Sequence, residues 1–327
     1  MNKKITLIAG FGLSIAGMWY AFRGIQLDEV LKALAGVDHR VVLAAIILMV
    51  YSAFVRAQRW RYLVLPQKKV PLSSLFSATM IGYFGNAVLP LRMGEIMRAY
   101  SLGTLEKISQ SNVFGTIILD RLLDMVGLVG VIILFTVMYP LSSAFGNILL
   151  IICIVTTLAV VLVYWLGKTK LPWDMLAEKF PFLQRGIGKT FWQMLEKIIE
   201  GVTAIRDTHH SFRITMYTVY LWVIYYVYLI ILVKAMHLEL DWVSVGILLI
   251  TTTLSISVPS APGYIGTYHA VAVAVLTQLF EVDMPSAQAF AVVMHAVGYI
   301  PFIIIGAYYF IHNSFHFADM KDAKETI

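Results

Sequence analysis

One stretch decides the fold: LSSLFSATMIGYFGNAVLPLRMGEIMR, residues 72–98. Its first part, residues 72–91, has the length and apolar character of a helix that crosses a bilayer core of about 30 Å. Four residues interrupt this run: Gly82, Gly85, Asn86 and Pro90. Because lipid cannot satisfy the N–H and C=O groups that a break leaves free, the break must lie against protein or a wet cavity. Lys69 and Lys168 belong to basic segments that are both expected to be cytoplasmic, and three apolar segments lie between them, so one of the three cannot cross fully. We therefore expect the broken segment, residues 72–91, to enter the membrane and return to the cytoplasmic side.

The rest of the chain is also apolar. Of its 327 residues, 59% are hydrophobic and 13% are charged, and the mean hydropathy is +0.79, whereas about 25% of a soluble domain is charged. This composition excludes a nucleic-acid-binding module, a secreted disulfide scaffold and an ordinary soluble enzyme. The other apolar stretches are residues 5–22, 41–55, 113–138, 148–166, 214–233, 243–258, 268–280 and 287–311. We expect an all-α polytopic membrane protein with about eight spanning helices plus re-entrant, broken segments.

Basic residues set the expected orientation, because Lys and Arg concentrate in cytoplasmic loops. They occur at residues 3–4, 56–69 and 168–213, whereas residues 139–147 are uncharged and residues 281–283 are acidic. We interpret the cluster at 56–69 as a topology signal that also suits anionic lipid headgroups. The segment 168–213 is expected to form an amphipathic helix on the membrane surface. Both termini are then cytoplasmic, the first span is uncleaved, and the location is the inner (cytoplasmic) membrane of a bacterium or archaeon.

A second break lies at residues 257–266, Ser-Val-Pro-Ser-Ala-Pro-Gly-Tyr-Ile-Gly, between two apolar segments. One broken apolar segment in each half of a chain is typical of inverted repeats that bind a substrate at their interface. We expect a single integral membrane domain over residues 1–327, with halves at 1–166 and 190–327 joined by the amphipathic segment. The alternative is that both breaks are ordinary surface loops.

Three charged residues follow the first break. Arg92, Glu95 and Arg98 are spaced by three, which places them on one face of a helix. The planar fork of arginine donates two hydrogen bonds to a phosphate, and a carboxylate between two guanidiniums can hold them in place. With Asn86 just before them, these residues predict a phosphate site. The alternative is an interfacial ion pair that ends a helix.

A second charged group, Asp120-Arg121-Leu-Leu-Asp124, lies inside the apolar stretch 113–138. Each charge at a helix centre costs about 2.5–3.5 kcal/mol on insertion scales, so these side chains need partners or a polar cavity. The expected partners are Arg92 and Arg98 for the two acids, and Glu95 for Arg121. An inert buried ion network is one alternative, and a divalent metal held by the two aspartates is another.

The third group ends the second break: Pro262, Gly263, Tyr264, Gly266 and His269. Glycine permits positive φ and close backbone approach, and the N–H groups that begin the following helix can receive an anion. His269 could titrate near neutral pH, the alternative being a hydrogen-bonded structural role. The eight histidines show no metal-ligand spacing and the chain has no nucleophile motif or P-loop, so we expect no metal, no cofactor and no catalytic residue.

Three motifs together resemble the lysylphosphatidylglycerol synthase transmembrane-region family, also called the flippase-like or dolichol-phosphate-glucose-synthetase-like family. They are Asn86…Leu89-Pro90-x-Arg92-x-Gly94-Glu95-x-x-Arg98, Asp120-Arg121-x-x-Asp124 and Pro262-Gly263-x-x-Gly266. The chain departs from the pattern of many relatives at Tyr264, at Asp120, and at His269 where a glutamate is usual. The resemblance covers nearly the whole chain and implies lipid translocation between leaflets.

We therefore expect a non-enzymatic, flippase-like transporter of a phospholipid or a polyprenyl-phosphate-linked lipid. Arg92, Arg98 and Arg121 would neutralise its phosphate, and Glu95, Asp120 and Asp124 would position these arginines or carry protons. Membrane lipids are the expected partners, nucleic acid is not, and a homo-oligomer is left open. The alternative is a membrane-embedded transferase acting on a polyprenyl-phosphate lipid, with Asp120 or Asp124 as base or metal ligand. A third option is a structural or regulatory membrane partner.

Overall fold

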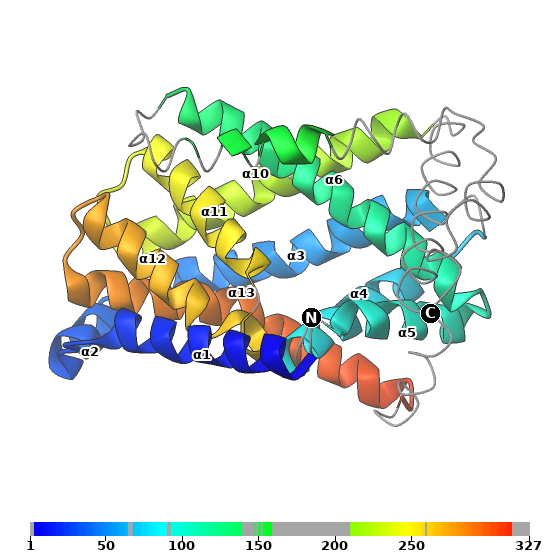
Figure 1. Ribbon diagram of the computed structural model, residues 1–327, viewed down its shortest axis with the longest axis horizontal. Coiled ribbons are helices and arrows are strands. Elements are labelled where there is room, and N and C mark those ends of the chain that lie inside the picture. The colour runs from blue at the N-terminus through cyan, green and yellow to red at the C-terminus, as the bar shows by residue number, and fades with distance from the viewer. Residues whose placement is uncertain are drawn as a thin grey trace.

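The described part of the chain is built from helices. The computed structural model describes residues 3–64, 68–89, 93–138, 147, 150–151, 153–158, 210–258 and 260–315, and none of these forms a strand. The helices with assigned bounds are α1 (Lys3–Phe22), α2 (Leu27–Ala35), α3 (His39–Val64), α4 (Leu72–Val88), α5 (Gly94–Glu106), α6 (Gln110–Thr136), α10 (Ser211–Ala235), α11 (Trp242–Ser257), the 3₁₀ turn η3 (Pro262–Tyr264), α12 (Thr267–Gln278) and α13 (Met284–His312). In Figure 1, α3 runs through the middle of the bundle, with α6 and α10 above it and α13 below. The all-α expectation is confirmed.

Several expectations fall on residues outside the described ranges. These are the amphipathic segment 168–213 up to residue 209, most of the expected span 148–166, the uncharged loop at 139–146, and the side chains of Arg92 and Pro259. They stay predictions.

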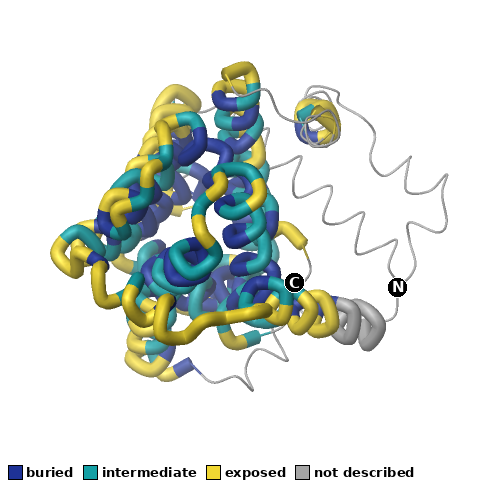
Figure 2. The backbone as a smooth tube through the Cα atoms, turned by 90° about the vertical axis from the view of Figure 1, so that its left-hand side faces the viewer, coloured by how far each residue is buried: buried dark blue, intermediate teal, exposed yellow. Residues whose placement is uncertain are grey.

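The outer surface of the bundle is apolar. Ile15, Phe212 and Ile304 are between 63% and 73% exposed, and a water-soluble monomer rarely exposes apolar patches on this scale. Figure 2 shows the buried residues gathered inside the bundle and the exposed ones around it. Three described helices, α3, α10 and α13, are long and apolar enough to cross a membrane. This protein is therefore an integral membrane protein.

The expected number of eight spans is not established. The stretch 268–280 corresponds to α12, which has 12 residues and is about 18 Å long at 1.5 Å per residue. A helix of that length does not cross a bilayer core of about 30 Å by itself. α11, which precedes it, is also short, with 16 residues. The span count, the inverted repeat and the cytoplasmic placement of both termini stay predictions.

The first broken segment forms a tight helical hairpin. α4 ends at Val88, and α5 begins at Gly94 and packs back against α4. The amide oxygen of Asn86 accepts a hydrogen bond from the Gly94 N–H at 3.0 Å, which satisfies a donor at the start of α5. A side chain at Gly94 would overlap the carbonyl oxygen of Gly82. The glycines thus allow the two helices to meet closely. The turn lies later than the sequence predicts, because Gly82, Gly85 and Asn86 are inside the continuous helix α4 and the return is made by α5, beyond residues 72–91. The return to the cytoplasmic side stays a prediction.

The second break lies beside the first. α11 ends at Ser257, η3 places Gly263 at φ +68°, and Gly266 at φ +94° precedes α12. η3 packs against α4, where Gly263 lies near Ala87. The two helix breaks therefore lie side by side in the bundle, although they are about 175 positions apart in the sequence.

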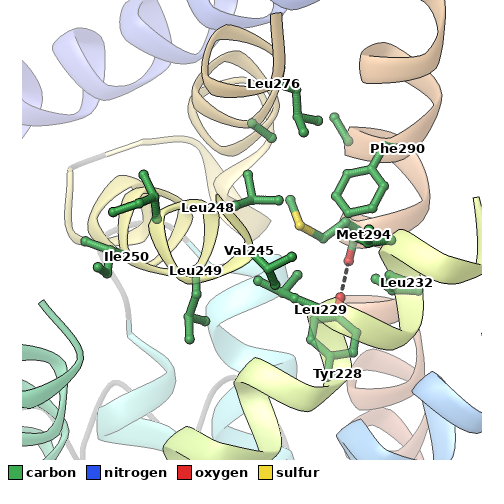
Figure 3. Packing of buried hydrophobic residues seen from close by; sticks show 14 of the residues in the cluster. Tyr228, Leu229, Leu232, Val245, Leu248, Leu249, Ile250, Leu276, Phe290 and Met294 are labelled. Atoms are coloured by element: carbon green, nitrogen blue, oxygen red, sulfur yellow. Dashed lines mark hydrogen bonds between the residues drawn. The ribbon is translucent and has the colours of Figure 1, made fainter. Parts of the chain in front are cut away.

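The largest hydrophobic core fills the space between α10, α11, α12 and α13. Figure 3 shows Leu248, Leu276 and Phe290 from three of these helices directed into it. Tyr228 is buried in the same cluster, and its hydroxyl donates a 2.8 Å hydrogen bond to the Met294 carbonyl. This core fixes the second half of the bundle around the break at η3.

Candidate functional site

A cavity of about 400 Å³ lies between the two breaks and the helices around them. Asn86 from the first break and Tyr264 from the second both line it. Its charged wall consists of Arg56, Glu95, Arg121 and Asp124. Most other lining residues are apolar or aromatic: Met49, Tyr83, Met125, Leu128, Trp222, Tyr225, Tyr228, Leu229, Leu249, Ile256, Tyr268, Tyr299 and Phe302. The cavity therefore combines one charged region with an apolar and aromatic remainder.

An inner group of charges lies behind this wall and is sealed. The side chain of Asp120 is fully buried, and its carboxylate accepts a 2.6 Å hydrogen bond from Arg59 and a 3.0 Å bond from Arg98. Arg59 is also fully buried, and it donates further bonds to the Asp120 carbonyl at 3.0 Å and to the Thr218 hydroxyl at 3.2 Å. We call Arg59, Arg98 and Asp120 the inner layer. Its charges are paired and closed off from solvent.

An outer group of charges faces the cavity. Asp124 is 20% exposed and accepts hydrogen bonds from Arg56 at 2.7 Å, from Arg59 at 2.6 Å and from Arg121 at 3.2 Å. Arg121 is 39% exposed and forms a close ion pair with Glu95. We call Arg56, Glu95, Arg121 and Asp124 the outer layer. Its contacts with Arg59 and Asp120 join it to the inner layer.

Helix spacing explains how the acids and guanidiniums meet. Asp120 and Asp124 are four residues apart on α6, and Arg56 and Arg59 are three apart on α3, so each pair lies on one helical face. α3 and α6 pack together with these faces toward each other. Tyr225 of α10 accepts a 3.0 Å bond from Arg56, so a third helix supports the group.

Arg98 is only partly satisfied. Its guanidinium stacks on the ring of Trp60 at 3.8 Å, yet its Nε and Nη2 atoms are buried and have no hydrogen-bond partner in the described part of the chain. One carboxylate oxygen of Glu95, Oε2, is likewise buried without a described partner. Leaving such groups unpaired costs about 1–3 kcal/mol each. The site can therefore form further hydrogen bonds, both as a donor through Arg98 and as an acceptor through Glu95.

The charges of the two layers do not cancel. Four guanidiniums face three carboxylates, which leaves one positive charge in excess among the described residues. A cavity with low-dielectric walls strengthens such a field. The site is therefore suited to an anion.

The structure brings together most of the predicted charged residues. The predicted pairs Glu95–Arg121 and Arg98–Asp120 are confirmed as contacts. Arg92 lies outside the described residues, so its predicted pairing with the acids is not tested. Whether these residues bind a lipid phosphate stays a prediction.

Two site residues were missed by the sequence analysis. Arg56 and Arg59 were assigned to a cytoplasmic topology signal at 56–69, but α3 continues to Val64 and buries both side chains. The interpretation is wrong for these two arginines because they are the main partners of Asp120 and Asp124. Their three-residue spacing at the end of an apolar helix was the signal that could have found them.

The residues of the second break are more dispersed. Tyr264 lines the cavity, whereas Gly266 lies against α1, where a side chain would meet the backbone of Ser14. The Gly263 carbonyl is 2.8 Å from Nε2 of His295, and Pro262 begins η3. His269 is buried beside His295, with ring centroids 4.6 Å apart, and is not part of the cavity wall. Among the described residues no group of three or more His, Cys, Asp or Glu could hold a metal ion.

Three curated relatives share part of the sequence. The UPF0104 membrane protein MJ1595 of Methanocaldococcus jannaschii is 29% identical over 126 residues, which are 38% of this chain and 36% of that protein. The UPF0104 membrane protein PH1989 of Pyrococcus horikoshii is 27% identical over 172 residues, 50% of this chain and 48% of that protein. Glycosyltransferase AglD of Haloferax volcanii is 27% identical over 137 residues, 41% of this chain and 22% of that protein. The chain thus spans less than half the length of each relative.

The expectation that the protein is not an enzyme is wrong, because the similar proteins include ones named as enzymes. One relative is named a glycosyltransferase, and the family model that matches the chain is named for a synthase. The transferase was ranked second because the sequence offers no recognisable site for a donor nucleotide, and no nucleophile motif occurs in it. That reasoning does not cover a reaction in which the nucleophile belongs to the substrate.

The family resemblance drawn from the three motifs is confirmed. The model described as the lysylphosphatidylglycerol synthase TM region matches residues 7–306. This match contains both helix breaks and all the charged residues of the two layers. Since it covers nearly the whole chain, this protein belongs to the lysylphosphatidylglycerol synthase transmembrane-region family.

Proposed function

We propose that this protein holds a phosphate-bearing lipid in the cavity as part of a membrane-embedded transferase reaction, with a polyprenyl phosphate as the lipid class. The observation that carries the proposal is the composition of the cavity wall. Arg56 and Arg121 offer guanidiniums to the phosphate, and the apolar and aromatic side chains suit the first carbons of the lipid chain. The name of the relative AglD supports the transferase part of the proposal.

The aspartates have positioning roles in this proposal. Asp120 is enclosed by three guanidiniums, and both oxygens of Asp124 accept hydrogen bonds from arginines. Neither carboxylate is therefore placed to act as a general base. The reaction does not require one, because an anionic phosphate oxygen can itself attack the anomeric carbon of a nucleotide-activated sugar. A new C–O bond forms, and the bond to the nucleotide breaks with its electrons leaving on the nucleotide phosphate.

Movement of the same lipid between leaflets is the second candidate function. It is favoured by the position of the cavity, because both helix breaks contribute to its wall through Asn86 and Tyr264. Sites between two broken segments are a feature of transporters built from repeats. Both candidates need the same phosphate site, and they differ in whether the bound lipid then reacts or crosses the membrane.

One reconstitution separates the two candidates. The full chain in vesicles is given farnesyl phosphate and a nucleotide-activated sugar, and the lipid-linked sugar is measured with and without a divalent ion. We expect product formation that is lost in Arg121→Gln and kept in Glu106→Gln, a change on α5 at an acid paired with Lys68 at 3.2 Å. Headgroup movement between leaflets without any product would favour the second candidate. Equal binding of farnesyl phosphate and farnesol would contradict both.

A further inference from the structure

Arg121 is the guanidinium of the network that a ligand can reach most easily. Its side chain is 39% exposed, whereas those of Arg56 and Arg59 are 6% and 0% exposed. Arg121 also shares Asp124 Oδ2 with Arg56, which binds that oxygen at 2.7 Å against 3.2 Å for Arg121. Its principal partner is therefore Glu95, and the Arg121–Glu95 pair decides whether an incoming anion finds a free guanidinium.

Glu95 is bound less completely than the other acids of the network. Asp120 and Asp124 each use both carboxylate oxygens, but Glu95 uses Oε1 alone, and its Oε2 is buried without a partner among the described residues. A buried carboxylate oxygen without a hydrogen bond has lost its hydration and gained no partner, so the carboxylate is held less firmly. Glu95 is thus the acid most easily displaced from its arginine.

A second place for the Glu95 carboxylate exists on the same helix. Arg98 follows Glu95 by three residues on α5, the spacing at which side chains of a helix meet. Its buried Nε and Nη2 atoms have no partner in the described part of the chain. A displaced Glu95 can therefore exchange one guanidinium for another without moving into solvent or leaving a new charge unpaired.

Carboxylate and phosphate are recognised by the arginine fork in the same way, through charge-assisted N–H···O bonds. We propose that Glu95 occupies the anion position on Arg121 when the cavity is empty, and that an entering lipid phosphate displaces it toward Arg98. This inference rests on the proposed phosphate site and describes how Glu95 regulates access to it. The bound phosphate then neutralises the one excess positive charge of the two layers. The Glu95 carboxylate and the phosphate compete for Arg121.

Competition predicts an affinity gain when the Glu95 charge is removed. Glu95→Gln keeps the size of the side chain, and we expect it to bind farnesyl phosphate on the order of tenfold more tightly, the change that one lost charge-assisted hydrogen bond produces. Farnesol is the uncharged reference ligand. Glu106→Gln is the matched control, because it removes a carboxylate from the other end of the same helix, and it should bind as the unchanged protein does.

The binding of farnesyl phosphate and of farnesol to the purified protein has three informative outcomes. Tighter binding by Glu95→Gln, with loss of binding in Arg121→Gln, supports the inference. Equal or weaker binding by Glu95→Gln, while the unchanged protein prefers farnesyl phosphate to farnesol, overturns it and leaves the proposed function in place. No preference for farnesyl phosphate in either protein overturns the proposed function together with the inference. If Glu95→Gln does not fold, Glu95→Asp, whose shorter carboxylate reaches Arg121 less well, should show the same gain in smaller measure.

Discussion

The inner and outer layers are both built from arginines and carboxylates but differ in what surrounds them. Asp120 and Arg59 of the inner layer are fully buried, and Asp120 has a guanidinium on each of its oxygens. Arg121 of the outer layer is 39% exposed and lies on the cavity wall. Breaking a buried ion pair lowers the stability of the fold, because the remaining charge has neither a counter-charge nor solvent around it. Exposed pairs contribute little to stability.

This difference separates a structural role from a binding role within one network. The inner layer ties α3, α5 and α6 together, and the outer layer presents guanidiniums to the cavity. A substitution in the inner layer should therefore reduce stability, and a substitution of Arg121, the most exposed guanidinium of the outer layer, should reduce ligand binding while the fold is kept. Asp120→Asn and Arg121→Gln test this contrast directly, and Gly94→Ala tests the helix contact that places Glu95. Their expected effects on stability decrease from Asp120→Asn through Gly94→Ala to Arg121→Gln.

Asp120→Asn should have the largest effect. It keeps the shape of the side chain but leaves Arg98 buried without a counter-charge and Arg59 with Asp124 alone. We expect a loss of about 3–5 kcal/mol in the free energy of unfolding. The measurement is thermal unfolding in detergent together with the yield of monodisperse protein. Glu106→Gln, at the opposite end of α5 from Glu95, serves as the control. An unfolding midpoint equal to that of the control would show that the inner layer does not stabilise the fold.

Helix spacing showed which charged side chains share a face within each motif. The pairs Glu95–Arg121 and Arg98–Asp120 were predicted by matching the acids of one motif with the guanidiniums of the other. The Arg121–Asp124 contact was not predicted. The arginines of α3 were not recovered. A basic cluster after an apolar stretch looks the same whether its guanidiniums are in solvent or buried against acids from another helix.

The second break shows another limit of the sequence. Tyr268 and His269 are neighbours at the start of α12, but only Tyr268 lines the cavity. His269 packs near Phe22 and His295 instead. Which face of a short helix is directed toward a cavity depends on how α1 and α13 pack around it, and local spacing carries no information about that packing. That the two breaks meet around a cavity was expected from one broken segment in each half, and η3 does pack against α4.

Gly94→Ala should have an intermediate effect on stability. The new methyl group would overlap the Gly82 carbonyl oxygen and the Asn86 side chain, so α4 and α5 must move apart. Overpacking of this kind costs about 1–3 kcal/mol. It also displaces Glu95, the next residue, from Arg121, so ligand binding should change as well. Gly130→Ala on α6 is the matched control, since nothing lies within 4 Å of its added methyl group, and it should gain about 0.5–1 kcal/mol.

Arg121→Gln should have the smallest effect on stability and the clearest effect on binding. The pairs that it removes are partly exposed, so the free energy of unfolding should fall by less than about 1 kcal/mol. Loss of a charge-assisted bond to phosphate should weaken farnesyl phosphate binding roughly ten- to hundredfold, and farnesol binding should not change. A variant that unfolds as readily as Asp120→Asn would show that Arg121 is structural, and the division between the layers would then be incorrect. A stable variant with selective loss of phosphate binding would place the ligand on the outer layer, because the inner arginines stay intact and yet do not replace Arg121.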